Sequence, residues 1–199
     1  MQQTRVIHFI GKSALIAFIG GLCIACLGQS KDQESETLFR SDKFKVELSY
    51  GNKWKRVEAN GEGILIMLEL SSIVDGTARC NLNATKNATE FRDPAFWMEE
   101  FKKPGVAKYV GDNIPGTKGK STFVGHREST LGGVPANEIE FKATGQGRSG
   151  RNNVEGLMTQ TVRGEWVYYT FCVSAEGDLD RRRDDFSEFV KNVKFVDSD

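Results

Sequence analysis

Histidine is scarce in this sequence, which has two among its 199 residues, His8 and His126. His8 lies in a basic leader that export would remove, so His126 is the one imidazole expected in the mature protein. A Ser-His-Asp centre would have to use it, and no nucleophile-elbow sequence is present. A lone histidine at the end of a strand is more often a surface or structural residue. We therefore predict no catalytic residues.

An excess of charge of either sign is also missing, because 27 Lys and Arg residues balance 27 Asp and Glu residues. Without a basic excess, nucleic acid is not an expected partner. The acidic stretch "EGDLDRRRDDF" lacks the loop spacing and the terminal glutamate of an EF-hand. We expect Asp178 or Asp180 to cap a helix there, with the neighbouring arginines paired to acids. The sequence predicts neither a metal site nor a cofactor.

The segment "GQGRSG" matches the letters of a dinucleotide-binding loop through Gly145, Gly147 and Gly150. Such a loop follows a strand and opens a helix, whose N-terminus then faces the pyrophosphate. Here strand-like sequence lies on both sides of the segment. We therefore expect a hairpin loop, with Arg148 and Arg151 directed to solvent.

Residues 1–25 have the pattern of an export signal. Arg5 and Lys12 give a positive leader without an acid, and fourteen uncharged residues follow at 13–26. That run is short for a hydrocarbon core about 30 Å thick and has the length of a signal-peptide apolar region. We predict that residues 1–25 are a signal peptide.

Two cysteines, Cys23 and Cys26, stand at the end of the apolar run. A redox pair would open a helix of a folded domain, and a zinc site would need two more ligands. The residues before Cys26, Ile24 and Ala25, instead resemble a bacterial lipobox, although Cys23 replaces the usual leucine. We predict lipidation of Cys26; the alternative is ordinary cleavage after Ala25 or Gly28, which gives a secreted soluble protein.

The composition changes again after Cys26. Residues 26–37 are mostly polar or charged and predict a flexible tether. Residues 38–199 are long enough for a single domain with its own core. We therefore expect a membrane-anchored lipoprotein of the cell envelope, which contacts the membrane through its N-terminal lipid.

Cys80 and Cys172 are the two cysteines that remain in the domain. Both lie in strand-like runs. In an oxidising compartment such a pair predicts a disulfide bond. The alternative is two buried thiols that pack as small hydrophobic groups.

The hydrophobic pattern alternates strands with helices. Half-buried and fully buried strands are expected at 44–50 and 63–70, a helix at 93–103, a three-stranded antiparallel meander at 136–143, 154–162 and 165–173, and a terminal helix at 180–196. The terminal helix places Phe186, Phe189, Val190 and Val193 on one face. This order predicts an α+β fold in which helices pack on an antiparallel β-sheet.

Four segments carry a family resemblance: "FKVELSYGNKWKRV", "LGGVPANEIEFKATG", "EWVYYTFCVSAEG" and "DDFSEFVKNVKFV". Together they resemble the PsbP-like group, which also includes the Ran-binding Mog protein and many small bacterial envelope lipoproteins. The likeness spans roughly residues 38–196. It implies an α/β/α sandwich and an accessory or binding protein without catalysis, and it carries over no ligand-binding residue.

A basic loop, "KKPGVAKYVGDNIPGTKGKS", is the candidate contact surface. Solvated flexibility is one interpretation of it. The other is contact with a protein or an anionic ligand of the envelope, steered by charge. The predicted contact residues are Lys108, Tyr109, Lys118, Lys120, Arg148 and Arg151. The alternative function is a carboxylate-dependent hydrolase of the cell envelope, in which two acids distant in sequence meet in a cleft.

Overall fold

The computed structural model describes residues 37–59, 63–72, 78–86, 94–100, 103, 105, 121–147 and 150–196. The predicted signal peptide, Cys26 and the tether up to residue 36 lie outside the described residues. Within the described part, no helix has the length and hydropathy needed to cross a membrane.

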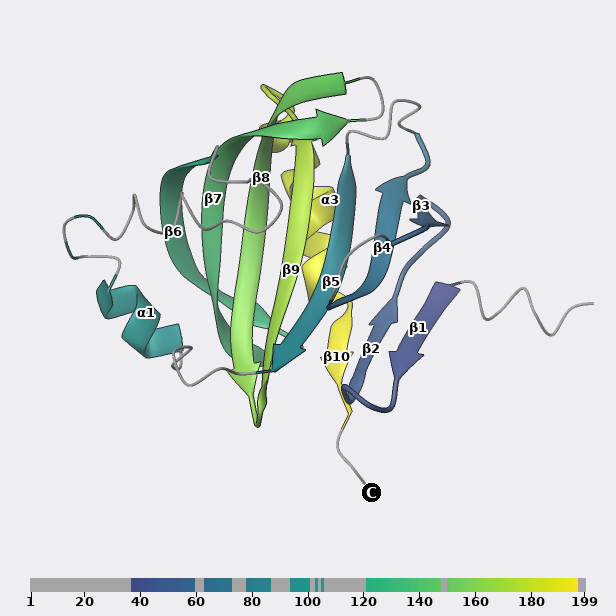
Figure 1. Ribbon diagram of the computed structural model, residues 1–199. Helices are drawn as coiled ribbons and strands as arrows, with labels where there is room; N and C mark the ends of the chain where they lie inside the picture. The colour runs from purple at the N-terminus through teal and green to yellow at the C-terminus, as the bar shows by residue number, and fades with distance from the viewer. Residues whose placement is uncertain are drawn as a thin grey trace, which may run out of the picture. The chain divides into compact units, whose positions relative to one another are not determined.

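A large antiparallel sheet forms most of the domain (Figure 1). Its strands run in the order β3 (Trp54–Val57), β4 (Ile64–Leu70), β5 (Arg79–Lys86), β9 (Trp166–Ala175), β8 (Gly150–Arg163), β7 (Val134–Gly147) and β6 (Ser121–Leu131). The predicted meander is confirmed as β7, β8 and β9, with β6 paired to its outer side. The antiparallel sheet that the order of elements predicted is therefore present, and it dominates the fold.

A small sheet joins the two ends of the domain. Its order is β1 (Leu38–Ser41), β2 (Val46–Ser49) and β10 (Val193–Phe195), and both neighbours of β2 are antiparallel to it. The prediction of one helix through residue 196 is wrong at its end, because Val193 pairs with Leu48 and Phe195 with Val46. This pairing gives hydrogen-bond partners to backbone groups at the edge of β2. If residues 193–195 were helical, those groups would have no partner in β10.

Two helices lie in the described residues, α1 (Pro94–Glu100) and α3 (Leu179–Lys191). Helix α1 confirms the predicted helix at 93–103 for seven residues and contacts β7 and β8. Helix α3 lies behind the large sheet in Figure 1 and contacts β6, β8 and β9. The apolar face predicted from the sequence is the face that it buries, with Phe186, Phe189 and Val190.

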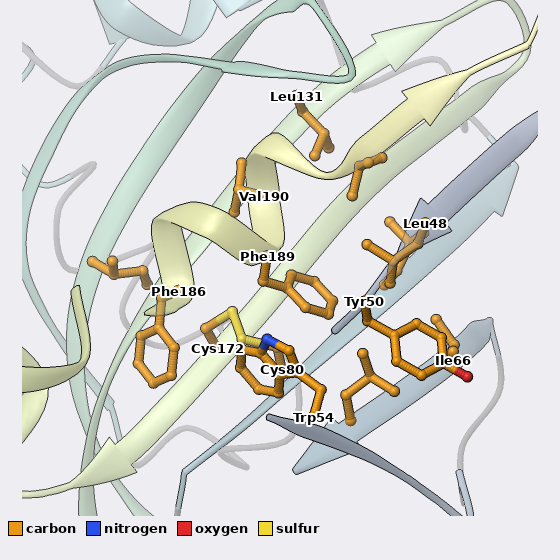
Figure 2. Packing of buried hydrophobic residues seen from close by; sticks show 14 of the residues in the cluster. Leu48, Tyr50, Trp54, Ile66, Cys80, Leu131, Cys172, Phe186, Phe189 and Val190 are labelled. Carbon is orange, nitrogen blue, oxygen red and sulfur yellow. A yellow bond between two sulfur atoms is a disulfide. The ribbon is translucent and has the colours of Figure 1, made fainter. Parts of the chain in front are cut away.

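The main core lies among α3, the small sheet and one face of the large sheet. Figure 2 shows Phe186 and Phe189 directed from α3 toward Trp54 and a disulfide bond. The Trp54 and Phe189 ring centroids are 5.6 Å apart. The disulfide joins Cys80 and Cys172, which are directly paired residues of β5 and β9 with Cα atoms 4.1 Å apart. The predicted bond is therefore present, and it crosses between neighbouring strands inside the core.

A second cluster lies on the other face of the large sheet, because alternate side chains of a strand point to opposite faces. Its buried members are Ile139, Phe141, Ala143, Met158 and Val173. Gly156 sits among them, paired with Phe141 on one side and Val173 on the other. A Cβ atom at Gly156 would lie 2.5 Å from Phe141 Cζ and 2.5 Å from the Cys172 carbonyl oxygen. Only glycine fits this position without movement of its neighbours.

The start of α3 differs from the sequence prediction in one respect. Asp178 occupies the N-cap position, but its side chain makes no capping hydrogen bond. Its carboxylate pairs instead with Arg181 at 2.6 Å and Arg182 at 3.1 Å. The predicted pairing of arginines with acids is confirmed, and the predicted capping role of Asp178 is wrong because these cations occupy its carboxylate.

Glu155 of β8 satisfies the backbone at the start of α3. Its carboxylate accepts a hydrogen bond from the Gly177 N–H at 3.0 Å and pairs with Lys142 at 2.7 Å. The Lys142 ammonium lowers the pKa of Glu155 most, and the N–H groups of Gly177 and Leu179 lower it further against the opposing effect of burial. The carboxylate therefore links β7, β8 and the first residue of α3.

We expect Glu155→Gln to lower the free energy of unfolding at pH 7, because the ion pair with Lys142 is lost. The loss should be only about 1 kcal/mol, because the Lys142 side of the contact is solvent-exposed. A carboxyl with a lowered folded pKa stabilises the protein above its unfolded pKa of about 4.3, and this contribution is lost as the pH falls through the folded pKa. Urea unfolding measures the free energy of unfolding at pH 7 and at pH 3.

The difference between the native protein and Glu155→Gln should shrink at pH 3. Glu128→Gln, at an exposed glutamate of β6, is the matched control and should change stability at neither pH. A Glu155→Gln deficit of equal size at both pH values would contradict the ionic role of this side chain.

Candidate functional site

One end of the domain gathers aromatic and basic side chains from separate segments of the chain. Phe44 comes from the turn between β1 and β2, Trp166 from the start of β9 and Phe195 from β10. All three are partly exposed and pack against the main core. We call these three residues, together with Lys43 and Arg163, the aromatic end.

The rings of the aromatic end contact one another directly or through Tyr168. Phe44 and Trp166 meet edge to face, with centroids 4.8 Å apart and planes at 78°. Tyr168 lies 4.7 Å from Phe195 between centroids, and its hydroxyl donates a hydrogen bond to the Phe44 carbonyl oxygen at 2.7 Å. Burial raises the pKa of Tyr168, so the hydroxyl keeps its proton at neutral pH. The buried tyrosine thereby fixes two partly exposed rings.

A cation lies over each of the exposed rings. Lys43 Nζ is 5.0 Å from the Phe44 centroid and 6.0 Å from that of Trp166. The Arg163 guanidinium carbon is 5.1 Å from the Phe195 centroid. These are cation–π distances, so apolar surface and positive charge are presented together.

Tight turns position these side chains. Arg163 and Trp166 are directly paired across a two-residue hairpin loop, in which Gly164 has φ +58°. Glycine at the first loop position is typical of a type II′ turn. In the other turn, Lys45 has φ +49° without being glycine, and its carbonyl oxygen accepts a hydrogen bond from the Val196 N–H at 3.0 Å. Tertiary contacts therefore hold Lys45 in a conformation that costs about 1 kcal/mol or more.

Positive charge predominates at this end among the described residues. The cations are Lys43, Lys45, Lys86 and Arg163. Lys86 is paired in register with Trp166, and its ammonium lies 3.6 Å from Glu165. The acid of the other turn, Asp42, is bound by Arg40 at 3.0 Å. The exposed rings are thus surrounded by cations with few free carboxylates.

The contact residues predicted from the sequence are not brought together in the described part of the chain. Lys108, Tyr109, Lys118, Lys120 and Arg148 lie outside the described residues. Arg151 lies on β8 opposite Gln146, at the end of that strand far from Arg163. The basic loop therefore stays a prediction, and the aromatic end contains none of the contact residues predicted from the sequence.

The carboxylates on β7 and β8 form ion pairs with cations. The pairs are Glu138 with Arg127, Glu140 with Arg183 and Glu155 with Lys142. A glycosidase-type centre needs one carboxyl with a raised pKa, to act as the acid. The pKa of Glu155 is shifted in the opposite direction. These three carboxylates thus give no support to the hydrolase alternative.

His126 lies on β6, paired with Ile139 and with its ring 5.9 Å from that of Phe123. Within the described residues, no three His, Cys, Asp or Glu side chains are grouped so as to hold a metal ion.

Sequence comparisons identify no relative. No protein-family model matches the chain. A search of curated proteins also finds no match.

Solved structures do match the fold. CyanoP, the PsbP protein of the cyanobacterium Synechocystis sp. PCC 6803, has a TM-score of 0.53 at 14% identity, with 88% of this chain and 100% of that chain covered. LpqN of Mycobacterium tuberculosis has a TM-score of 0.50 at 15% identity, with coverages of 76% and 83%. The yeast Ran-binding protein Mog1p, from Saccharomyces cerevisiae, has a TM-score of 0.46 at 7% identity, with coverages of 80% and 95%. This TM-score is too low to carry an argument.

The chain is therefore an antiparallel-sheet protein with a packed C-terminal helix. More specifically, its fold is similar to that of PsbP, as the four sequence segments implied. At such low identities the likeness concerns the fold alone.

Sequence reasoning missed the aromatic end. It assigned Phe44 to the apolar face of a strand at 44–50 and placed Trp166 within a strand at 165–173. The available signal was an aromatic residue beside cations at a turn, in "DKFK" and "RGEW". That signal is short, and the contact between the two turns appears only in the folded chain.

Proposed function

We propose that this protein is exported to the cell envelope, is anchored by a lipid on Cys26 and acts as a non-catalytic binding or assembly accessory protein. The PsbP-like fold supports this proposal, since LpqN is involved in cell envelope biogenesis. We also propose the complete α/β/α layering of that fold, with α1 as the second helical layer.

The observation that carries export is the disulfide bond. Cys80 and Cys172 are 0% and 1% exposed and lie at the centre of the core. Structural disulfides form and persist in oxidising compartments and are rare in the reducing cytosol. A core built around such a bond fits a protein that folds after export.

The observation that supports binding is the aromatic end. Trp and Arg side chains are enriched among residues that carry binding energy. Here Trp166 and Arg163 are fixed by short turns, so little side-chain freedom is lost when a partner binds. The basic loop, with Lys108, Tyr109 and Lys118, is the second proposed surface.

The anchor is tested by Cys26→Ala. We expect the native protein in the membrane fraction and the variant released or misprocessed, because the acylated thiol is absent. Fractionation followed by immunoblotting measures the distribution. Cys23→Ala is the matched control, since it removes the neighbouring thiol and leaves Cys26 in place.

An intact-mass spectrum provides the decisive check on the anchor. The mature native chain should begin at Cys26 and carry a lipid. A chain that begins at Cys26 or Gln29 without added lipid mass would rule the anchor out and leave a secreted soluble protein.

The binding surface is tested by pull-down from envelope extract with three forms of the protein. One variant changes the loop lysines to serine (Lys102, Lys103, Lys108, Lys118 and Lys120), and the other combines Lys43→Gln with Trp166→Ser. We expect partner recovery to fall at least tenfold in one variant and to weaken with salt. Undiminished recovery with both variants would exclude both surfaces.

A further inference from the structure

We propose that the aromatic end docks on the anionic headgroups of a bilayer, so that the domain touches the membrane that its lipid anchor enters. This inference rests on the proposed function, because only an exported and anchored domain is held next to a bilayer. The lipid and the aromatic end would then be two contacts with one surface.

The chemistry of the aromatic end suits the membrane–water interface. Tryptophan and other amphipathic aromatic rings favour the headgroup level of a bilayer, and lysine pairs there with phosphate. Lys43 lies over both Phe44 and Trp166, so its ammonium is presented together with the two exposed rings. A ring that enters the interface therefore brings a cation to the phosphates.

The charge around the rings has the sign that an anionic surface requires. Lys43 lies over Phe44 and Trp166, Arg163 lies over Phe195, and Lys45 follows Phe44 in the chain. The Lys86 ammonium lies 3.6 Å from Glu165. Each lysine or arginine near an anionic leaflet strengthens its binding several-fold. An acidic protein would match the same charge, but partly exposed Phe and Trp rings under the cations favour a surface with an apolar layer just beneath its phosphates.

The aromatic end is also rigid before binding. Tyr168 ties the Phe44 carbonyl to the core, and the hairpin at Gly164 fixes Arg163 beside Trp166. Lys45 is held by the backbone of residue 196. Docking therefore orders few side chains, so the contacts have less conformational entropy to offset.

The anchor brings the aromatic end within reach of the bilayer. Residues 26–37 span at most about 40 Å when fully extended, and β1 then leads in four residues to the turn that carries Lys43 and Phe44. A tether of this length makes the second contact intramolecular, at an effective concentration near the millimolar range. A weak interfacial contact is then sufficient.

Vesicle binding tests this inference on the full exported chain. The probes are phosphatidylcholine vesicles with and without about one third phosphatidylglycerol, and the signal is the emission shift and quencher protection of Trp166. Subtraction of the Trp166→Phe protein isolates that signal. We expect a blue shift on the anionic vesicles alone, and we expect it to be suppressed by 0.5 M NaCl.

Two double variants locate the contact. Lys43→Gln with Lys45→Gln should lower the affinity for anionic vesicles about tenfold or more. Lys55→Gln with Lys191→Gln removes the same charge from β3 and from the end of α3, and should leave the affinity unchanged. Equal urea midpoints for the native protein, the Trp166→Phe protein and the two double variants exclude unfolding as the cause.

Certain results would overturn the inference. They are an equal Trp166 shift on both kinds of vesicle, no shift on either, or equal losses in the two double variants. If Cys26→Ala still releases the protein while Trp166 shows no shift, the anchor stands and bilayer docking fails. If a protein partner is then lost with Lys43→Gln and Trp166→Ser, the aromatic end binds protein and not lipid.

Discussion

Replacing Cys80 and Cys172 together with alanine is expected to lower the free energy of unfolding by about 4 kcal/mol. The bond closes a loop between residues 92 positions apart, and the chain-entropy model gives several kcal/mol for a loop of that length. The two cysteines are paired in register on β5 and β9, so the folded sheet accommodates a bond between these neighbouring strands. Urea unfolding of the native and double-alanine proteins measures the loss.

Thiol mapping gives an independent result for the same bond. Under denaturing, non-reducing conditions, neither Cys80 nor Cys172 should react with an alkylating reagent. After reduction in denaturant, both should react. Labelling of both cysteines in the oxidised protein would mean that they are packed thiols, and the case for an oxidising compartment would fall with the bond.

Reductant should act slowly on the native fold. Both cysteines are almost completely buried beneath α3, so a thiolate reaches the bond only after the core opens. We expect the rate of reduction to follow the rate of unfolding as urea is added. Fast reduction without denaturant would show that the region between β5 and α3 opens locally.

Gly156→Ala is expected to lower the free energy of unfolding by about 3 kcal/mol. The new methyl group would stand 2.5 Å from a ring atom of Phe141 and 2.5 Å from a backbone oxygen of Cys172. Neither neighbour moves freely, because the ring is stacked on Phe171 at 4.9 Å and the oxygen belongs to a central strand. Overpacking of a rigid core typically costs 1–3 kcal/mol, and this site combines two close contacts.

Gly125→Ala is the matched control for that substitution. Gly125 also lies in a strand of the large sheet, beside a register shift, with a φ outside the left-handed region, and a Cβ atom there would meet nothing within 4 Å. We expect its effect to stay within about 0.5 kcal/mol. Equal effects at the two glycines would indicate a general loss of strand flexibility and would refute the steric argument at Gly156.

The sequence predicted the fold well where the apolar pattern fits only one period. In β7, Ile139 and Phe141 alternate with glutamates, and β9 is rich in aromatic and β-branched residues, so both strands were predicted within a few residues of their bounds. At the C-terminus, Val193 continues the helical spacing of Phe189 and Val190 and also begins the alternation with Phe195. Local sequence does not decide between the two, and pairing with β2 does.

The candidate site was harder to predict for a related reason. The basic loop was selected because its lysines are close together in sequence. The aromatic end instead assembles from Lys43 and Phe44, from Arg163 and Trp166, and from Phe195, which no local pattern connects. Its geometry depends on the register of β9 and on where β10 ends, and both are set by long-range pairing.

The pairing of β2 with β10 also bears on how the chain reaches its folded state. Leu48, near the start of the domain, finds its strand partner in Val193, near the end. Contacts so distant in sequence raise the contact order and slow folding, because the intervening chain must be ordered before they form. The small sheet cannot close until β10 has emerged from the ribosome. Until then Val46 and Leu48 lack their cover, and the nascent domain presents an open strand edge that a chaperone can hold.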